Sequence, residues 1–286
     1  MKFIRLSAIV LTILALLKNN ATGQTISNAF FKNPELMKKT ILFALPEKLE
    51  GEISNEEIEQ TIRKYWTINT NYEILPITKV IEACKAEKDK YIAAVFKTNK
   101  LYQLFDYSPK TFDGLYPNTL SLQFFCGRSN CYVSYTYLQG IISKSDFVVG
   151  LMTTQYYYQN GSKFKETVIL EESAAQNGGR LKTKKLLFDK SVTKMTESEI
   201  GAAYPYSHEL VEHDVIEEAI LSKKEDVLIV YFGSYSPFGG SGASTPTKII
   251  YDPSDGAFVS SSRAKPLGQI DEKDLGQFLK NAGLGK

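Results

Sequence analysis

Apolar and polar positions along the first half of the chain predict a defined series of strands and helices. A basic lead-in and an apolar run over residues 36–44 predict a strand, and a helix follows from Ser54. A second strand is expected over 72–76, followed by a helix and a buried strand ending at Phe96. A hairpin over 120–138 and an apolar helix complete the series. The predicted order is β-α-β-α-β-β-β-α.

The second half of the chain repeats this order. Residues 181–189 predict a strand, and a helix follows from Thr196. A strand over 208–212 then leads into a helix and a buried strand. Two strands flank the Pro-Ser-Asp-Gly turn at 253–256, and a last helix opens at Asp271. We therefore expect an α/β fold of two tandem duplicated three-layer units, each with a mixed sheet.

Two helix starts carry the strongest signal of duplication. Ser54 with Glu57, and Thr196 with Glu199, each form the S/T-x-x-E capping box at matching positions. The segments around them also align, since LMKKTILFA resembles LKTKKLLFD and KVIEACKAEKDKYIAAVF resembles DVIEEAILSKKEDVLIVYF. The alternative is chance similarity between two generic α/β stretches.

The duplication sets the expected domain boundaries. Unit one spans 36–161 and unit two spans 181–284, and the polar segment 162–180 is the expected linker.

The N-terminus predicts a cleavable export signal. Lys2 and Arg5 precede an apolar run of about a dozen residues, which is too short for a membrane span of roughly 20. Small residues up to Gly23 fit a cleavage site, so residues 1–23 are the expected signal peptide. The alternatives are an uncleaved anchor and a buried N-terminal helix. We expect a periplasmic or secreted protein with no transmembrane segment after cleavage.

Removal of this signal changes the charge of the chain. The full sequence has 34 basic and 32 acidic residues, and the signal contains Lys2, Arg5 and Lys18, so 31 basic residues remain against 32 acidic ones. A net charge near zero gives no reason to expect nucleic acid or an anionic membrane as a partner.

Export also bears on the three cysteines. Cys126 and Cys131 bracket a four-residue Gly-Arg-Ser-Asn loop inside the predicted hairpin, which favours a structural disulfide in an oxidising compartment. A redox site and a zinc site are weaker alternatives, because the spacing is not C-x-x-C and few ligands lie nearby. Cys84 falls on the apolar face of a predicted helix and is expected to be buried.

The two histidines argue against a zinc protease. His208 and His213 are five residues apart, whereas H-E-x-x-H needs a spacing of four on one helix face. The alignment places His208 on a strand, at the position of Tyr72, where residues five apart point to opposite faces. We expect no metal and no cofactor. Glu57 and Glu199 are expected to be helix caps, and Trp66 to lie in the core.

A Gly-rich segment in unit two is the most unusual part of the chain. It connects a strand ending near Phe232 to the next hairpin and fits neither a P-loop nor a dinucleotide loop, because no helix follows it. Ser241 resembles the nucleophile of G-x-S-x-G but lacks the strand-turn-helix context. The segment is either a surface loop without a role or a partner or ligand loop. Its candidate contact residues are Tyr235, Phe238, Gly239, Gly240, Ser241 and Gly242.

The chain resembles uncharacterised exported proteins of the Bacteroidota. The resemblance rests on KKTILFALP, RKYW and YEIL in unit one and on LKTKKLLFD and YPYSHELVEHDVIEEAI in unit two, and it covers most of the mature chain. It implies no established activity and no catalytic residues. The element order is also similar to mixed-sheet periplasmic domains of the Tol-propeller and curli-secretion kind, which are docking modules.

These observations favour a non-catalytic docking module that binds a protein or envelope partner. The cleft between the units and the Gly-rich segment are the expected contact regions. The alternative is a hydrolase of envelope or extracellular polymers that uses carboxylates at strand ends, such as Asp189. Carboxylates converging at the ends of parallel strands would favour the enzyme, and an apolar or Tyr-lined surface would favour docking.

Overall fold

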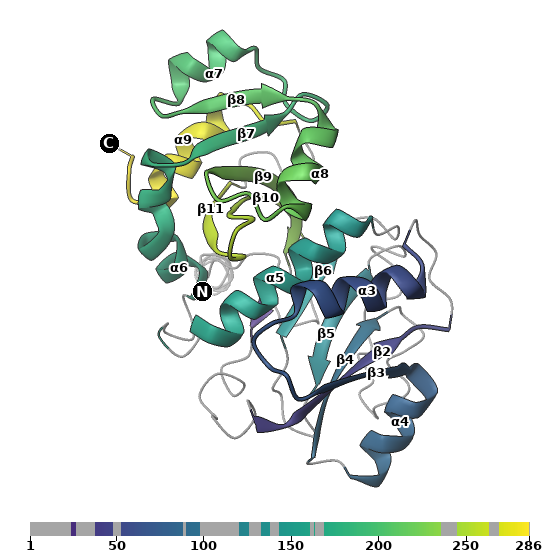
Figure 1. Cartoon of the computed structure of the whole chain (residues 1–286). Coiled ribbons are helices and arrows are strands. Elements are labelled where there is room, and N and C mark those ends of the chain that lie inside the picture. The colour runs from purple at the N-terminus through teal and green to yellow at the C-terminus, as the bar shows by residue number, and fades with distance from the viewer. Residues whose placement is uncertain are drawn as a thin grey trace, which may run out of the picture.

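The computed structural model describes residues 24–26, 38–47, 53–87, 90–97, 120–125, 133–137, 143–160, 163, 169–235, 245–262 and 269–285. These residues form a mixed α/β fold with two sheets and helices between and around them (Figure 1). The elements follow the predicted order β-α-β-α-β-β-β-α in both halves of the chain.

The first sheet has the strand order β1-β6-β5-β4-β2-β3. Strand β2 lies parallel to both β3 and β4, while β5, β6 and β1 continue the sheet with antiparallel pairing. The strands of this sheet are β1 (Gln24–Ile26), β2 (Thr40–Leu45), β3 (Tyr72–Pro76), β4 (Tyr91–Lys97), β5 (Leu120–Phe125) and β6 (Val133–Tyr137).

The described residues of this half include the helices α3 (Asn55–Tyr65), α4 (Ile77–Ala86) and α5 (Lys144–Asn160). Helix α3 begins with the predicted capping box, in which Ser54 accepts from the Glu57 backbone and Glu57 accepts from the Ser54 backbone. Helix α5 begins in the same way, because Ser143 and Asp146 exchange the two equivalent hydrogen bonds.

The second sheet has the strand order β11-β10-β9-β7-β8. Strand β7 is parallel to β8 and β9, and the β9–β10 and β10–β11 pairs are antiparallel. Both sheets therefore combine a parallel start with an antiparallel hairpin, as predicted. The strands are β7 (Lys185–Asp189), β8 (His208–Val211), β9 (Val227–Tyr235), β10 (Thr245–Tyr251) and β11 (Phe258–Ser262).

The helices of this half are α7 (Glu197–Ala203), α8 (His213–Leu221) and α9 (Glu272–Asn281). Thr196 and Glu199 form the predicted capping box of α7, and Asp271 caps α9 with Asp274. Helix α9 ends before Gly283, whose φ of +73° lies in the left-handed region that favours glycine at a helix end.

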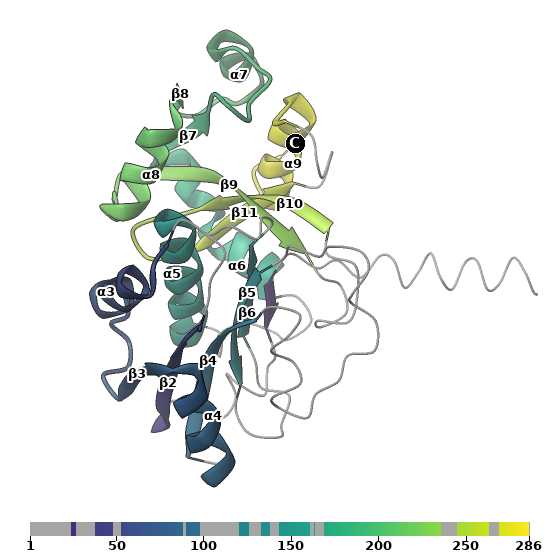
Figure 2. The same cartoon turned by 90° about the vertical axis from the view of Figure 1, so that its right-hand side faces the viewer.

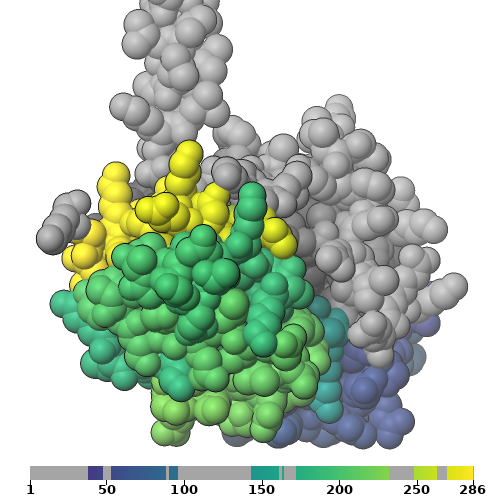
Figure 3. Space-filling view, turned by 90° about the horizontal axis from the view of Figure 1, so that it is seen from above, coloured from purple at the N-terminus to yellow at the C-terminus, as the bar shows by residue number. Residues whose placement is uncertain are grey.

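Helices and sheets alternate in five layers (Figure 2). Helix α4 covers one face of the first sheet, where Ala44, Ile77 and Val80 belong to a small core. The largest core lies between the two sheets and includes residues from α3, α5 and α8. A third core lies beneath α7 and α9 on the far face of the second sheet, around Phe188 and Phe278. Figure 3 looks from above onto the second half of the chain, in which the earlier residues (green) lie beside the C-terminal ones (yellow).

Helix α5 occupies the centre of the molecule. Thirteen of its seventeen residues are buried, including Tyr157, because side chains from both halves pack around it. Gln155 of this helix donates to the Tyr65 carbonyl and accepts from the Thr67 amide, which attaches α5 to the end of α3. The Tyr65 hydroxyl in turn donates to the Leu221 carbonyl, 2.6 Å away at the end of α8.

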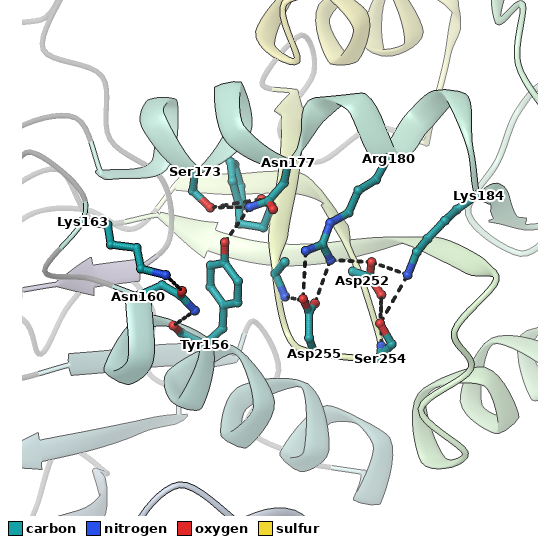
Figure 4. A network of polar contacts seen from close by, with 12 residues as sticks. Tyr156, Asn160, Lys163, Ser173, Asn177, Arg180, Lys184, Asp252, Ser254 and Asp255 are labelled. Carbon is teal, nitrogen blue, oxygen red and sulfur yellow. Dashed lines mark hydrogen bonds and ion pairs between the residues drawn. The ribbon is translucent and has the colours of Figure 1, made fainter.

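The expected linker at 162–180 contains regular structure. Helix α6 (Ile169–Asn177) and the 3₁₀ helix η5 (Gly178–Lys182) precede the second half, and α6 contacts β11. The Ser173 hydroxyl and the Asn177 amide both donate to the Phe258 carbonyl. Asn177 also donates to the Tyr156 hydroxyl of α5 (Figure 4). Helix α6 is thus packed between α5 and the second sheet.

Candidate functional site

The candidate site lies at the carboxyl ends of two neighbouring parallel strands, β7 and β8. Asp189 is the last residue of β7, and His213 is the first residue of the helix that follows β8. The helix after β7 belongs to the outer layer, and the helix after β8 packs between the sheets. In open α/β sheets, ligands bind beyond the carboxyl ends of the parallel strands.

Asp189 and His213 make a short hydrogen bond at this position. The His213 Nδ1 atom lies 2.6 Å from Asp189 Oδ2, so Nδ1–H donates to the carboxylate. The other oxygen of Asp189 accepts from the Ser191 amide at 2.8 Å and from the Ser191 hydroxyl at 2.6 Å. The carboxylate is buried, whereas 65% of the His213 side chain is exposed. A buried acceptor therefore fixes the orientation of an accessible imidazole.

The Nε2 atom of His213 makes no hydrogen bond within the described residues. The Oε1 atom of Glu217 lies 4.0 Å from Nε2, one helical turn further along α8. With the proton on Nδ1, Nε2 presents a lone pair that can accept a proton.

The pair alters the pKa values of both groups. Burial by itself raises the pKa of the Asp189 carboxyl, but hydrogen bonds from Ser191 and His213 outweigh burial and hold that pKa below its ordinary value. The hydrogen bond to Asp189 raises the pKa of His213 above 6.5, against partial desolvation. Attraction to Glu217 and Asp146 adds to this increase.

Helix α5 of the first half contributes to the site. The Ser145 hydroxyl donates to Glu217 Oε1 at 2.9 Å, and the Ser143 hydroxyl lies 2.8 Å from that of Ser145. Asp146 accepts a hydrogen bond from the Tyr231 hydroxyl of β9. The site is thus assembled from both halves of the chain at the place where α8 contacts α5 (Figure 1).

The charge of the site is negative. The three carboxylates of Asp146, Asp189 and Glu217 all interact with the His213 imidazole. The net charge of these four groups is therefore negative even when the imidazole is protonated. A site of this sign repels anionic ligands and attracts neutral or cationic ones.

The first sheet has an apolar cluster at the corresponding place. Ile41 pairs with Tyr72 in the first sheet as Leu186 pairs with His208 in the second, which fixes the correspondence between the two. Pairing to the third strand agrees, since Ile41 pairs with Ile92 as Leu186 pairs with Leu228. On this register the positions of Asp189, His213, Glu217 and Tyr231 correspond to Ala44, Ile77, Ile81 and Val95, which pack together in the core beneath α4.

A second polar cluster closes the turn between β10 and β11 (Figure 4). Arg180 and Lys184 both contact the buried Asp252 at 2.6 Å, and Arg180 also pairs with Asp255. Burial lowers the pKa of Arg180, but Asp255 and Asp252 outweigh it and leave a net upward shift. Because each charge has a partner and Asp252 also accepts from Ser254, this cluster braces a turn.

The third polar cluster is a buried ion pair. Lys248 of β10 contacts Asp274 of α9 at 2.5 Å, and both side chains are at most 1% exposed. Lys248 also donates to the Gln269 carbonyl, and Asp274 accepts from Ser262. The pair joins the outer helix to the sheet and has no access to solvent.

Several predicted site residues can now be located. His208 lies on β8 as predicted, with Nδ1 against the Tyr206 carbonyl and its ring beside Tyr204. Glu57 and Glu199 are helix caps, and Trp66 is buried. Cys84 is half-buried, and burial raises the pKa of its thiol to about 11.

The remaining predicted residues lie at the edge of the described residues or outside them. Tyr235 ends β9 and pairs with Thr245, the first residue of β10. Phe238, Gly239, Gly240, Ser241 and Gly242 lie outside the described residues, as do Cys126, Cys131 and the predicted signal peptide.

The pairing of His213 with Asp189 was not predicted from the sequence. His213 was expected to continue the strand that holds His208, whereas the strand ends at Val211 and His213 opens a helix. The alignment of the two halves contained part of the signal, because polar Asp189 aligns with apolar Ala44.

No group of three or more His, Cys, Asp or Glu side chains in the described part of the chain could hold a metal ion. No helix within the described ranges is both long and apolar enough to cross a bilayer.

Comparison with known proteins finds no matching family model, no matching curated protein and no matching solved structure.

Proposed function

We propose that the protein is a hydrolase in which His213 transfers protons and Asp189 orients it. The observation that carries this proposal is the exposed imidazole held by a buried carboxylate at the carboxyl ends of β7 and β8. Asp189 fixes the Nδ1–H form of the ring and stabilises the imidazolium that arises when Nε2 takes a proton. Proton transfer by a positioned side chain contributes about 10²- to 10⁴-fold to a rate.

A purely structural role explains the pair less well. An ion pair with one exposed partner contributes roughly 0–1 kcal/mol to stability. The first sheet has the same local arrangement with Ala44 and Ile77 in these positions. The frame therefore forms without the polar pair, which supports a chemical role for Asp189 and His213 in the second half.

A panel of chromogenic substrates tests this proposal. We would assay p-nitrophenyl acetate and butyrate, p-nitroanilides of single amino acids, and p-nitrophenyl glycosides with purified mature protein. Replacing His213→Gln and Asp189→Asn should each lower the turnover of the accepted substrate by about 100-fold or more. His208→Gln is the matched control and should retain activity. Turnover of no substrate, or turnover unchanged in His213→Gln, would contradict the proposal.

Docking of a protein or envelope partner is the second candidate function. The observation that favours it is the pairing of Tyr235 with Thr245, which places both ends of segment 236–244 side by side at the end of a hairpin. Because β9 is parallel to β7, this end of the hairpin extends beyond the same end of the sheet as Asp189. Deleting residues 238–244 should weaken partner recovery from envelope extracts while the melting temperature stays unchanged. Unchanged recovery would contradict a role for segment 236–244 in binding the partner.

Export of the mature chain is part of the proposal. Its support is the basic, apolar and small-residue pattern of residues 1–23, together with Cys126 and Cys131 in one predicted hairpin. Fractionation of cells should place the protein in the periplasm or the medium, with Gln24 as the first residue. Alkylation before and after reduction should detect one bond between Cys126 and Cys131.

We also propose that the two halves arose by duplication. Three observations support this origin, namely the shared strand order, the matching registers of the parallel strands, and the capping boxes at both α3 and α7 and both α5 and α9. A solved structure in which the two sheets superpose poorly in this register would contradict it.

A further inference from the structure

We propose that a water molecule bound between His213 Nε2 and Glu217 Oε1 is the nucleophile, and that the substrate is a neutral or cationic acyl compound such as an ester or amide. This inference rests on the proposed hydrolase function and adds a second catalytic residue and a substrate class to it.

The geometry between the two side chains suits a bridging water. Nε2 and Oε1 are 4.0 Å apart, which is too long for a direct hydrogen bond. One water can lie at about 2.8 Å from both atoms, donating one hydrogen to each. His213 then receives the proton that leaves during attack, and Glu217 holds the second hydrogen and so orients the oxygen.

Glu217 is held in place from the first half of the chain. The buried Ser145 at the start of α5 donates to the same oxygen, Oε1, at 2.9 Å. The side chain of Glu217 is 39% exposed, so it is accessible to solvent while Ser145 restrains its carboxylate. This restraint distinguishes Glu217 from Glu218, the next residue on α8, which is exposed.

The reaction balances with these groups alone. The water oxygen bonds to the acyl carbon while one of its protons passes to His213 Nε2. The tetrahedral intermediate then expels the alcohol or amine, which takes that proton from His213. The products are the carboxylic acid and the alcohol or amine, and both side chains return to their starting states.

The charge of the site selects the substrate class. Asp146, Asp189 and Glu217 give it a net negative charge, which disfavours phosphate esters and other anions. Glycoside hydrolysis ordinarily requires one carboxyl as acid and a second as base or nucleophile, both free to reach the sugar. Here Asp189 is buried and bonded to Ser191 and His213, so it cannot take either role. Acyl transfer to water needs only the imidazole and an oriented water.

The test compares Glu217→Gln with the matched control Glu218→Gln, using p-nitrophenyl acetate as the neutral probe and p-nitrophenyl phosphate as the anionic probe. Glutamine retains an acceptor for Ser145 but removes the charge. We expect kcat on the acetate to fall on the order of 10- to 100-fold in Glu217→Gln. The rising limb of the pH profile should move to lower pH, because loss of the Glu217 charge lowers the pKa of His213. Glu218→Gln should change neither, and the phosphate should be hydrolysed far more slowly than the acetate.

The outcomes separate this inference from the proposed function. Acetate hydrolysis that depends on His213 but is unchanged in Glu217→Gln would overturn the role of Glu217. Faster hydrolysis of the phosphate would overturn the substrate class. Hydrolysis that does not depend on His213, or none at all, would overturn the hydrolase proposal itself. A proton NMR titration of His213 in Glu217→Gln adds a readout without substrate, and an unmoved titration would contradict the proximity of the two charges.

Discussion

Asp189 and Ala44 occupy corresponding places on the two sheets, yet one is a carboxylate bonded to an imidazole and the other is a methyl group in an apolar core. The two strands have the same neighbours in the same register, so the difference lies in the side chains. At this end of the first sheet, apolar side chains pack against α4. At the same end of the second sheet, ionisable side chains from three elements lie close together.

The first prediction concerns the protonation of His213. The chain has two histidines, so its proton NMR spectrum has two sets of imidazole signals, which His208→Gln assigns. The His213 signal should titrate above 6.5 in the native protein, because Asp189 accepts from Nδ1. Asp189→Asn should lower that pKa. A His213 titration below 6.5 in the native protein would contradict the contact.

The second prediction is the pH dependence of stability. The raised pKa of His213 means that its contribution is fully present below about pH 6.5 and is lost as pH rises through the folded value. The lowered pKa of Asp189 means that its contribution is present above about pH 3.8 and is lost as pH falls through its folded value. The pair should therefore stabilise most between roughly pH 4 and 6.5.

Urea unfolding of the native protein and of His213→Gln measures this contribution. Since the imidazole is largely exposed, the difference in unfolding free energy should be about 0.5–1 kcal/mol at pH 5.5 and should approach zero at pH 9. A difference that grows with pH would have the wrong sign.

The third prediction concerns Gly256 in the turn between β10 and β11. Its φ is +83°, and a Cβ atom there would lie 2.2 Å from the Met152 carbonyl oxygen of α5. Gly256→Ala should therefore destabilise the protein by about 2–4 kcal/mol through strain and overlap. Gly276→Ala is the control, since a Cβ atom there meets no atom within 4 Å and alanine favours a helix by about 1 kcal/mol. The melting temperature should fall in Gly256→Ala and rise in Gly276→Ala.

The fourth prediction concerns the buried pair of Lys248 and Asp274. Lys248→Met leaves the Asp274 carboxylate buried without its cation, which should cost about 3–5 kcal/mol. Lys185→Met makes the same substitution in an exposed ion pair with Glu209 and should cost less than about 1 kcal/mol. Equal losses in urea unfolding of the two variants would show that burial of the Lys248 pair does not matter.

The sequence predicted the local and near-neighbour parts of the fold well. Capping boxes such as Ser54 with Glu57 are local signals, because the partners are three residues apart. The order of helices and strands along each half follows from the pattern of apolar and polar runs. The alignment even matched Tyr72 with His208, and both residues pair with corresponding positions of the neighbouring strand.

The packing of the two halves could not be predicted from such local signals. Gln155 bonds to residues about ninety positions away, and nothing in its neighbourhood identifies Tyr65 or Thr67 as partners. Helix α6 lies in a polar stretch that predicted a linker, because its order comes from contacts with β11 and α5. The candidate site also depends on packing between the halves, since Ser145 and Glu217 come into contact only after the halves associate.

The burial of α5 between the two sheets has a consequence for the order of folding. Once the first 160 residues have been synthesised, α5 can rest on its own sheet, but Tyr156 and the face turned toward α8 still lack their covering. That face is closed only when the C-terminal half arrives. A chain cut near residue 163 should therefore give an N-terminal fragment that aggregates alone and is rescued by the separately produced C-terminal fragment, so that the two halves behave as one cooperative unit.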